Sequence, residues 1–270
     1  MKSTTFKSLS LAVGMVVGVM AASSASAVSI PQFQIDPTDS GVTPGVYGTQ
    51  FTGSSSERYT MTGGNTLTTT FGYMDLGSLT NDGPMGTIGT VLPGISGIGV
   101  NYQLYFTYSL TAQLLTGTLG GFGSTYSVTA LNFNLWYAPG LDTSFTPATL
   151  LADAAVNQGG TADYSIASGS LVSPGTAGIT ALGGAYVNAT TDFILNAAGK
   201  NYFVDPVPFY NLAFTSQINN TGGVNVNAPY VAISASGNVS FQTVPEPATL
   251  ALMGLGLVGM GVSLRKRKAA

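Results

Sequence analysis

The stretch Ser124–Tyr137, with the sequence STYSVTALNFNLWY, alternates between apolar and polar side chains along its second half. In an extended chain, successive side chains point to opposite faces. One face of this stretch carries Leu131, Phe133, Leu135 and Tyr137, and the other carries Asn132, Asn134 and Trp136. The pattern therefore predicts a β-strand with one buried and one solvated face.

Other parts of the body show the same period of two. The apolar positions near the end of the body are Val231, Ile233, Ala235, Val239 and Phe241, and they alternate with Ser234, Ser236, Asn238 and Ser240. Asn101–Thr111 is another strand candidate, rich in Tyr, Leu and Phe. Gly63–Gly64 lies between two such stretches and predicts a hairpin turn.

We therefore expect an all-β fold for residues 28–244: one antiparallel β-sandwich domain, either jelly-roll-like or Greek key. The one helix expected within it is Pro147–Val156, with Thr146 as its N-cap and Pro147 at its first position. Tyr202–Phe203 and Phe209–Tyr210 are expected to form a packed corner rather than a binding site.

The composition restricts the chemistry that the chain can perform. Charged residues make up 7% of the chain, and cysteine and histidine are absent. This absence excludes disulfides, thiolate nucleophiles, Cys/His zinc sites and imidazole catalysis. Between Val28 and Val244 only Arg58 and Lys200 are basic, against ten acidic residues. Such an acidic body is not expected to bind nucleic acid through phosphate contacts.

Residues 1–27 have the three parts of a secretory signal peptide. Lys2 and Lys7 give a positively charged start, and an apolar run follows at residues 9–22. Ala25 and Ala27 then fit the A-x-A pattern of signal-peptide cleavage. We expect a signal helix, delivery to the secretion translocon and cleavage after Ala27, with an uncleaved anchor as the alternative.

Residues 245–270 form a second targeting signal. Pro245, Glu246 and Pro247 precede the apolar run 248–264, which as a helix would be about 25 Å long, near the lower limit for crossing a bilayer. Four basic residues follow directly: Arg265, Lys266, Arg267 and Lys268. They are expected to hold this end in the cytoplasm. We therefore expect a transmembrane helix in the inner membrane, with an apolar hairpin strand as the alternative.

The tripeptide, the apolar run and the basic cluster together resemble the PEP-CTERM sorting signal. The resemblance implies recognition by an integral-membrane exosortase, in bacteria that make exopolysaccharide. It also implies an exported protein that is anchored in the inner membrane during sorting and then lies at the cell surface or in the extracellular matrix.

Short segments of the body resemble PEP-CTERM proteins associated with flocculation. These segments are Phe33–Thr38, Asn81–Gly83, Gly99–Tyr105, Ile166–Gly169 and Phe203–Leu212. The chain departs from that pattern because it lacks a cysteine pair in its later half and because the stretch after Ile218 has no counterpart. The resemblance implies an extracellular protein that cells need in order to aggregate within their polysaccharide matrix.

Few catalytic arrangements are open to this composition. The acidic pairs nearest in sequence are Asp75 with Asp82 and Asp153 with Asp163, and a glycosidase would need one such pair across a cleft. We interpret these residues as turn-stabilising instead. Lys200 follows Gly199 beside an expected turn, and we interpret it as solvated rather than as a catalytic base.

A calcium site is a second possibility in an acidic extracellular protein, because calcium takes oxygen ligands. Asp75, Asn81 and Asp82 could converge, as could Asp36 and Asp39, but no EF-hand loop or calcium-binding nonapeptide repeat is present. We therefore predict no metal site and no cofactor.

Trp136 and Asn134 are the candidates for carbohydrate contact. They share one face of the predicted strand, and amphipathic rings beside amides can stack on sugars and hydrogen-bond their hydroxyl groups. The alternative is that Trp136 packs under a loop. The two terminal signals and the lack of catalytic residue types predict a non-enzymatic surface or matrix protein, and the resemblance implies that it promotes flocculation or biofilm formation with exopolysaccharide. A carboxylate-dependent enzyme acting on extracellular polysaccharide and a passive envelope protein are the alternatives.

Overall fold

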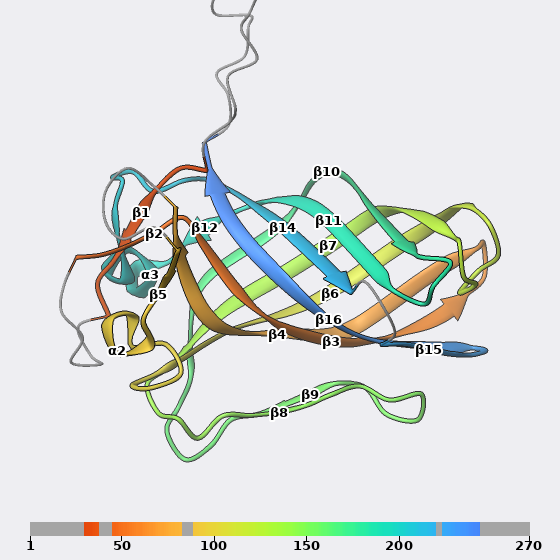
Figure 1. The fold of residues 1–270 in the computed structure, drawn as a ribbon, viewed down its shortest axis with the longest axis horizontal. Coiled ribbons are helices and arrows are strands. Elements are labelled where there is room, and N and C mark those ends of the chain that lie inside the picture. The colour runs from red at the N-terminus through yellow and green to blue at the C-terminus, as the bar shows by residue number, and fades with distance from the viewer. Residues whose placement is uncertain (1–29, 38–44, 83–88, 220–222, 244–270) are drawn as a thin grey trace, which may run out of the picture.

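Eight long antiparallel strands form a closed β-barrel in the computed structural model, which describes residues 30–37, 45–82, 89–219 and 223–243 (Figure 1). In chain order the strands are β3 (Gln50–Thr62), β4 (Thr66–Asn81), β6 (Gln103–Thr116), β7 (Thr125–Ala138), β10 (Tyr164–Ile179), β11 (Ala185–Asp192), β14 (Leu212–Asn219) and β16 (Tyr230–Gln242). Each strand pairs with the next along the chain, and β16 returns to pair with β3. The barrel is therefore of the up-and-down type.

The closed barrel shows that the predicted β-sandwich, whether jelly-roll-like or Greek key, is wrong. The pairing of β16 with β3 runs from Tyr230 opposite Thr60 to Ser240 opposite Gln50, and it joins the two ends of one sheet. A sandwich and a barrel both bury one face of each strand, so both give the same alternation in the sequence. The period of two therefore predicts strands but does not distinguish between these two architectures.

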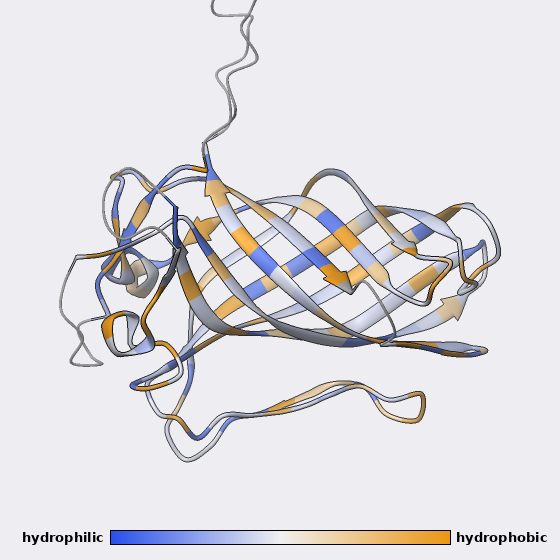
Figure 2. Cartoon of the chain, in the orientation of Figure 1, coloured by the Kyte–Doolittle hydropathy of each residue, from blue (hydrophilic) through white to orange (hydrophobic). Residues whose placement is uncertain are grey.

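The individual strand predictions are confirmed. The stretch around Ser124–Tyr137 is β7, in which Leu131, Phe133, Leu135 and Tyr137 are buried and Asn132 and Asn134 are exposed. Asn101–Thr111 largely coincides with β6, the 231–241 stretch lies in β16, and Gly63–Gly64 lies in the turn between β3 and β4. Figure 2 shows hydrophobic and hydrophilic residues alternating along the barrel strands.

The helix predicted at Pro147–Val156 is wrong. This segment is irregular and leads into a short strand, β9 (Ala155–Asn157), which pairs with β8 (Ser144–Thr146) outside the barrel. Contacts with the barrel replace the contacts of a helix: the Ala148 N–H donates to Ser56 Oγ at 2.9 Å, and Arg58 Nε binds Asp153 Oδ1 at 2.7 Å. Tertiary contacts thus override a local helix signal.

Shorter elements extend the barrel and cover one end of it. β5 (Gly89–Val91), β12 (Ile194–Leu195) and β15 (Val224–Asn227) add to β4, β10 and β16 respectively. A separate three-stranded sheet consists of β1 (Phe33–Ile35), β2 (Val46–Gly48) and β13 (Phe203–Asp205). It lies at one end of the barrel with the two short helices α2 (Pro93–Ser96) and α3 (Ala197–Tyr202) (Figure 1).

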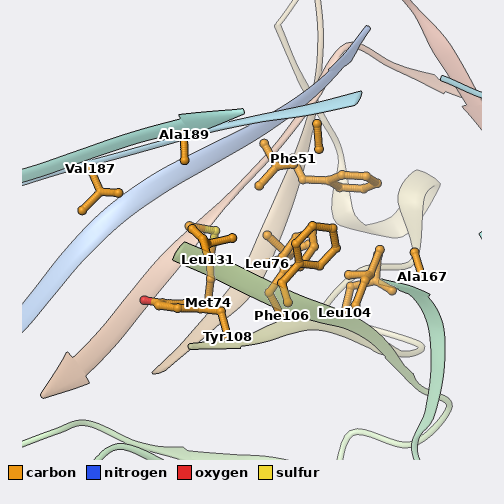
Figure 3. Close-up of a cluster of buried hydrophobic side chains, with 14 of the residues drawn as sticks. Phe51, Met74, Leu76, Leu104, Phe106, Tyr108, Leu131, Ala167, Val187 and Ala189 are labelled. Atoms are coloured by element: carbon orange, nitrogen blue, oxygen red, sulfur yellow. The ribbon is translucent and has the colours of Figure 1, made fainter. Parts of the chain in front are cut away.

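An aromatic cluster joins this small sheet to the barrel. Its rings have centroid separations of 4.6 to 6.2 Å between contacting pairs and belong to Phe33, Phe51, Phe193, Phe203, Phe209 and Phe241. The Tyr210 hydroxyl donates to the Gln32 carbonyl at 2.8 Å. The packing predicted for this corner is therefore confirmed, whereas Tyr202 within it also lines a pocket at the end of the barrel. Further along the barrel the interior is filled by side chains such as Met74, Leu104 and Phe106 (Figure 3).

Within the described residues, no helix has both the length and the apolar character needed to cross a membrane. The signal helix predicted in residues 1–27 and the transmembrane helix predicted at 248–264 both lie outside the described residues.

Candidate functional site

Trp136 and Asn134 lie on the outer face of β7, within a polar surface that the Asp192 carboxylate borders through its hydrogen bond with Ser170 Oγ at 3.3 Å. Pairing with β6 and β10 sets Thr107, Asn134 and Ser168 in one cross-strand row. A second, parallel row holds Ser109, Asn132 and Ser170. We call this surface the Trp136 patch, and it consists of Thr107, Ser109, Asn132, Asn134, Trp136, Ser168 and Ser170. The two rows present amide and hydroxyl groups side by side.

The Trp136 ring is held in one orientation. Its Nε1–H donates to Thr107 Oγ1 at 2.9 Å, and its ring lies within 10° of parallel to that of Tyr105, with centroids 6.3 Å apart. The Trp136 side chain is half-buried. The sequence analysis gave two alternatives, an exposed ring and a ring packed under a loop, and the observed burial lies between them. A fixed aromatic ring beside exposed amides needs little reordering to contact a ligand.

A flap, residues 140–163 with β8 and β9, covers the barrel surface beside this patch (Figure 1). Its Phe145 ring packs on Tyr73 and Tyr105, with centroids 5.1 and 5.4 Å away. The Tyr105 hydroxyl donates to Asp163 Oδ2 at 2.6 Å and accepts from Gln158 Nε2 at 2.9 Å. The flap therefore buries Tyr105 and leaves Trp136 at its border.

Replacing Phe145 with alanine is expected to loosen the flap without unfolding the barrel. The substitution removes two aromatic contacts, which are worth about 1 kcal/mol each. Hydrogen exchange of backbone amides in residues 140–163 should then be about tenfold faster or more, while exchange in β14 stays unchanged. Phe122→Ala is the control, because Phe122 is 60% exposed and lies in the turn before β7. Unchanged exchange in the flap of Phe145→Ala would contradict this assignment.

The acidic pairs considered for catalysis each have a structural role or are far apart. Asp75 lies on β4 and Asp82 directly follows the end of this strand. Seven residues of extended chain separate them by about 23 Å, which is too far for the two carboxyl groups to act on one bond. Asp153 binds Arg58, whereas Asp163 accepts from the hydroxyls of Tyr105 and Thr143. Burial raises the pKa of Asp75. Among the described residues, no three acidic side chains converge on one point.

The other residues weighed for catalysis or calcium are also placed. Asn81 is buried and accepts a hydrogen bond from Gln32 Nε2 at 2.7 Å. Lys200 is exposed on α3, as the sequence predicts. Asp39 lies outside the described residues, and Asp36 lines a separate pocket at the end of the barrel.

The buried carboxyl group of Glu57 is not among the candidate site residues that the sequence predicts. It points into the barrel with 1% of its surface exposed and accepts from the Tyr108 hydroxyl at 2.6 Å. Gln217 Nε2 in turn donates to Tyr108 at 3.4 Å. Burial raises the pKa of Glu57 to about 7, against the lowering effect of hydrogen bonds from Tyr108 and Tyr59. The alternation of side chains along the strand could have identified Glu57 as buried, because Ser55, Glu57 and Tyr59 share one face of β3.

The barrel interior beside this carboxyl group leaves little room for a ligand. The space there has a volume of about 30 Å³, and its lining includes Gln217. Met74, Phe106 and Tyr108, which also line it, are shown in Figure 3. This volume accommodates about two water molecules. The interior of the barrel is therefore a packed core, and candidate ligand contacts lie on its outer surface and at its end.

The predicted targeting residues all lie outside the described residues: Ala25, Ala27, Pro245, Glu246, Pro247, Arg265, Lys266, Arg267 and Lys268. For the C-terminal group, the comparison with known families gives direct support. The family described as PEP-CTERM protein-sorting motif matches residues 243–268, which include the tripeptide, the apolar run and the basic cluster. No curated protein and no solved structure matches the chain.

The matched motif defines the class of protein: it is exported and is anchored in a membrane while it is sorted. More narrowly, the chain carries the PEP-CTERM protein-sorting motif at residues 243–268, and this motif implies exosortase as its processing partner. No comparison supports the resemblance of the body to flocculation-associated proteins, so that resemblance stays a prediction. Cleavage after Ala27 and delivery by the secretion translocon are also predictions.

Proposed function

We propose that the processed protein is a non-enzymatic component of the cell surface or extracellular matrix, where it binds exopolysaccharide and promotes cell aggregation, flocculation or biofilm formation. The observation that carries this proposal is the Trp136 patch. Its two cross-strand rows offer hydroxyl and amide groups beside a fixed indole ring, and none of its side chains is charged. Neutral sugars present the complementary groups: hydroxyls that donate and accept hydrogen bonds and C–H faces that stack on rings.

The sorting signal supports the location that this function requires. Exosortase processing applies to exported proteins, and the chain carries the matching motif at residues 243–268. The acidic body favours a neutral or cationic polymer over a polyanion, because like charges repel.

Binding of purified exopolysaccharide to patch variants tests the proposal. Trp136→Ala and, separately, the double variant Asn132→Ala/Asn134→Ala should each weaken binding about tenfold, which corresponds to the loss of about 1.4 kcal/mol. Cells that express either variant should flocculate less than cells with the wild-type protein. The double variant changes only exposed side chains, so its effect does not depend on the packing of Trp136.

The matched control is Ser236→Ala, which removes an exposed hydroxyl from the outer face of β16. This control should bind like the wild type. If the control weakens binding and the patch variants do not, the contact surface lies elsewhere on the barrel. If flocculation persists after deletion of the gene and the protein binds no polysaccharide, the chain is a passive envelope component and the proposal is wrong.

A further inference from the structure

A second site, a partly open pocket, lies at the end of the barrel that carries α3. Here a pocket of about 360 Å³ is lined by Asp36, Tyr137, Tyr164, Asn201 and Tyr202, among others. These residues come from the segment after β1, the end of β7, the start of β10 and the helix α3. The volume suits a small ligand, and the lining combines aromatic rings with a few polar groups, as ligand sites commonly do.

Tyr137 and Tyr164 form one wall of this pocket, and the Tyr102 ring supports Tyr137 from behind. The rings of Tyr102 and Tyr137 lie 4.8 Å apart at 15°, and those of Tyr137 and Tyr164 lie 5.2 Å apart at 31°. Tyr102 and Tyr137 are buried, whereas Tyr164 is 37% exposed. The stack is anchored inside the protein, because the Tyr102 hydroxyl donates to the Ser96 carbonyl at 2.9 Å and lies 2.8 Å from the Tyr202 hydroxyl. Tyr164 is thus a rigidly supported ring at the edge of the pocket.

Asp36 and Asn201 supply the polar groups. The Asp36 N–H donates to the Tyr202 carbonyl at 2.8 Å, which fixes the backbone of Asp36 against α3. Its Oδ1 atom is buried and has no hydrogen-bond partner among the described residues. A buried carboxylate oxygen without a partner is costly, and a ligand hydroxyl could supply the missing hydrogen bond. Asn201 is exposed and its amide can both donate and accept.

We propose that this pocket binds one neutral pyranose unit, with the sugar ring against Tyr164 and adjacent hydroxyl groups at Asp36 and Asn201. A carboxylate accepts hydrogen bonds only, so it matches sugar hydroxyls as donors and disfavours phosphate or carboxylate ligands. The inference rests on the proposed function for the origin of the sugar, which is then the end or a side branch of a matrix polysaccharide. It differs from the Trp136 patch, because that patch is an open surface suited to the length of a chain.

Saturation-transfer NMR with the methyl glycosides of glucose, galactose and mannose tests the pocket on the mature protein. At least one glycoside should receive saturation from the wild-type protein. Tyr164→Ala and Asp36→Asn should each weaken its binding about tenfold, whereas Tyr164→Phe, which keeps the ring, should retain most of the affinity. Phe122→Ala is the control, since it removes an exposed ring at the opposite end of β7.

Saturation of none of the three glycosides would overturn the proposal. Binding that Tyr164→Ala and Asp36→Asn leave unchanged would overturn it as well, provided that both variants keep the wild-type near-ultraviolet circular dichroism. Preference for choline over every glycoside would also overturn it and would identify a cation site.

Failure of the pocket proposal is distinguishable from failure of the proposed function. If the polysaccharide binds through the Trp136 patch and no glycoside binds, only the pocket assignment is wrong. If glycosides bind and the polysaccharide does not, the pocket assignment stands and the proposed function is wrong.

Discussion

In a host with exosortase, the mature protein is expected to lose its apolar run 248–264 and the basic tail behind it, and to leave the inner membrane. In a host without exosortase, the same segment should stay attached and the protein should stay in the inner-membrane fraction. The physical reason is that an apolar run of this length followed by four basic residues is retained in a bilayer until it is removed. Intact mass and membrane fractionation in the two hosts measure both effects, which are expected to be nearly complete.

The triple variant Pro245→Ala/Glu246→Ala/Pro247→Ala should behave in the exosortase host as the wild type does without exosortase. Pro174→Ala is the matched control, because it replaces an exposed proline within β10 and leaves the sorting motif intact. An intact tail and an inner-membrane location in both hosts would contradict processing. The proposed matrix function would then lose the export step on which it depends.

The free energy of unfolding is expected to fall by about 3 kcal/mol as the pH rises from about 4.5 to 7, because of Glu57. Burial raises the pKa of this carboxyl group from 4.5 to about 7 in the folded protein. Between these values the folded protein holds a proton that the unfolded chain has released. Stability from this group is therefore complete below pH 4.5 and is lost as the pH rises through 7, by about 1.4 kcal/mol per pH unit.

Urea unfolding at several pH values between 4.5 and 7.5 measures this dependence. Glu57→Gln keeps the size of the side chain and removes its titration, so its stability should depend much less on pH in this range. Burial also raises the pKa of Asp75, so this carboxyl group shifts stability in the same direction as the pH rises. Asp153→Asn, which changes a carboxylate on the flap, serves as the control and should keep the steep slope. An equal slope in the wild type and Glu57→Gln would show that Glu57 is not the group responsible.

The sequence predicts the strands well because each strand has one face against the core. Leu131, Phe133 and Leu135 identify β7 without knowledge of its neighbours, and Val239 and Phe241 do the same for β16. Closure of the barrel depends instead on pairing between β3 and β16, which are far apart in the chain. Local periodicity carries no information about such pairing, so the sandwich and the barrel could not be distinguished.

The candidate sites likewise have a part that follows from local sequence and a part that depends on contacts between distant segments. Trp136 and Asn134 share a face by their spacing alone, and this part was predictable. Their neighbours in the Trp136 patch depend on the register of three strands, and the end pocket brings together Asp36 and Tyr164, which are far apart in the sequence. The signal for the flap was misleading, because Thr146 and Pro147 are typical of a helix start. Contacts of Ser56 and Arg58 with the flap decided its conformation instead.

If the proposed matrix function holds, the return of β16 to β3 has a consequence for a protein that is packed at high local concentration. Each of the eight barrel strands has a neighbour on both sides, so the barrel itself has no free edge to which a strand of another molecule could add. Molecules crowded together in a matrix are thereby protected from joining their barrels into an extended intermolecular sheet. Cohesion between cells would then depend on a polymer that links separate barrels, and an enzyme that digests this polymer should disperse the cells while the protein stays folded.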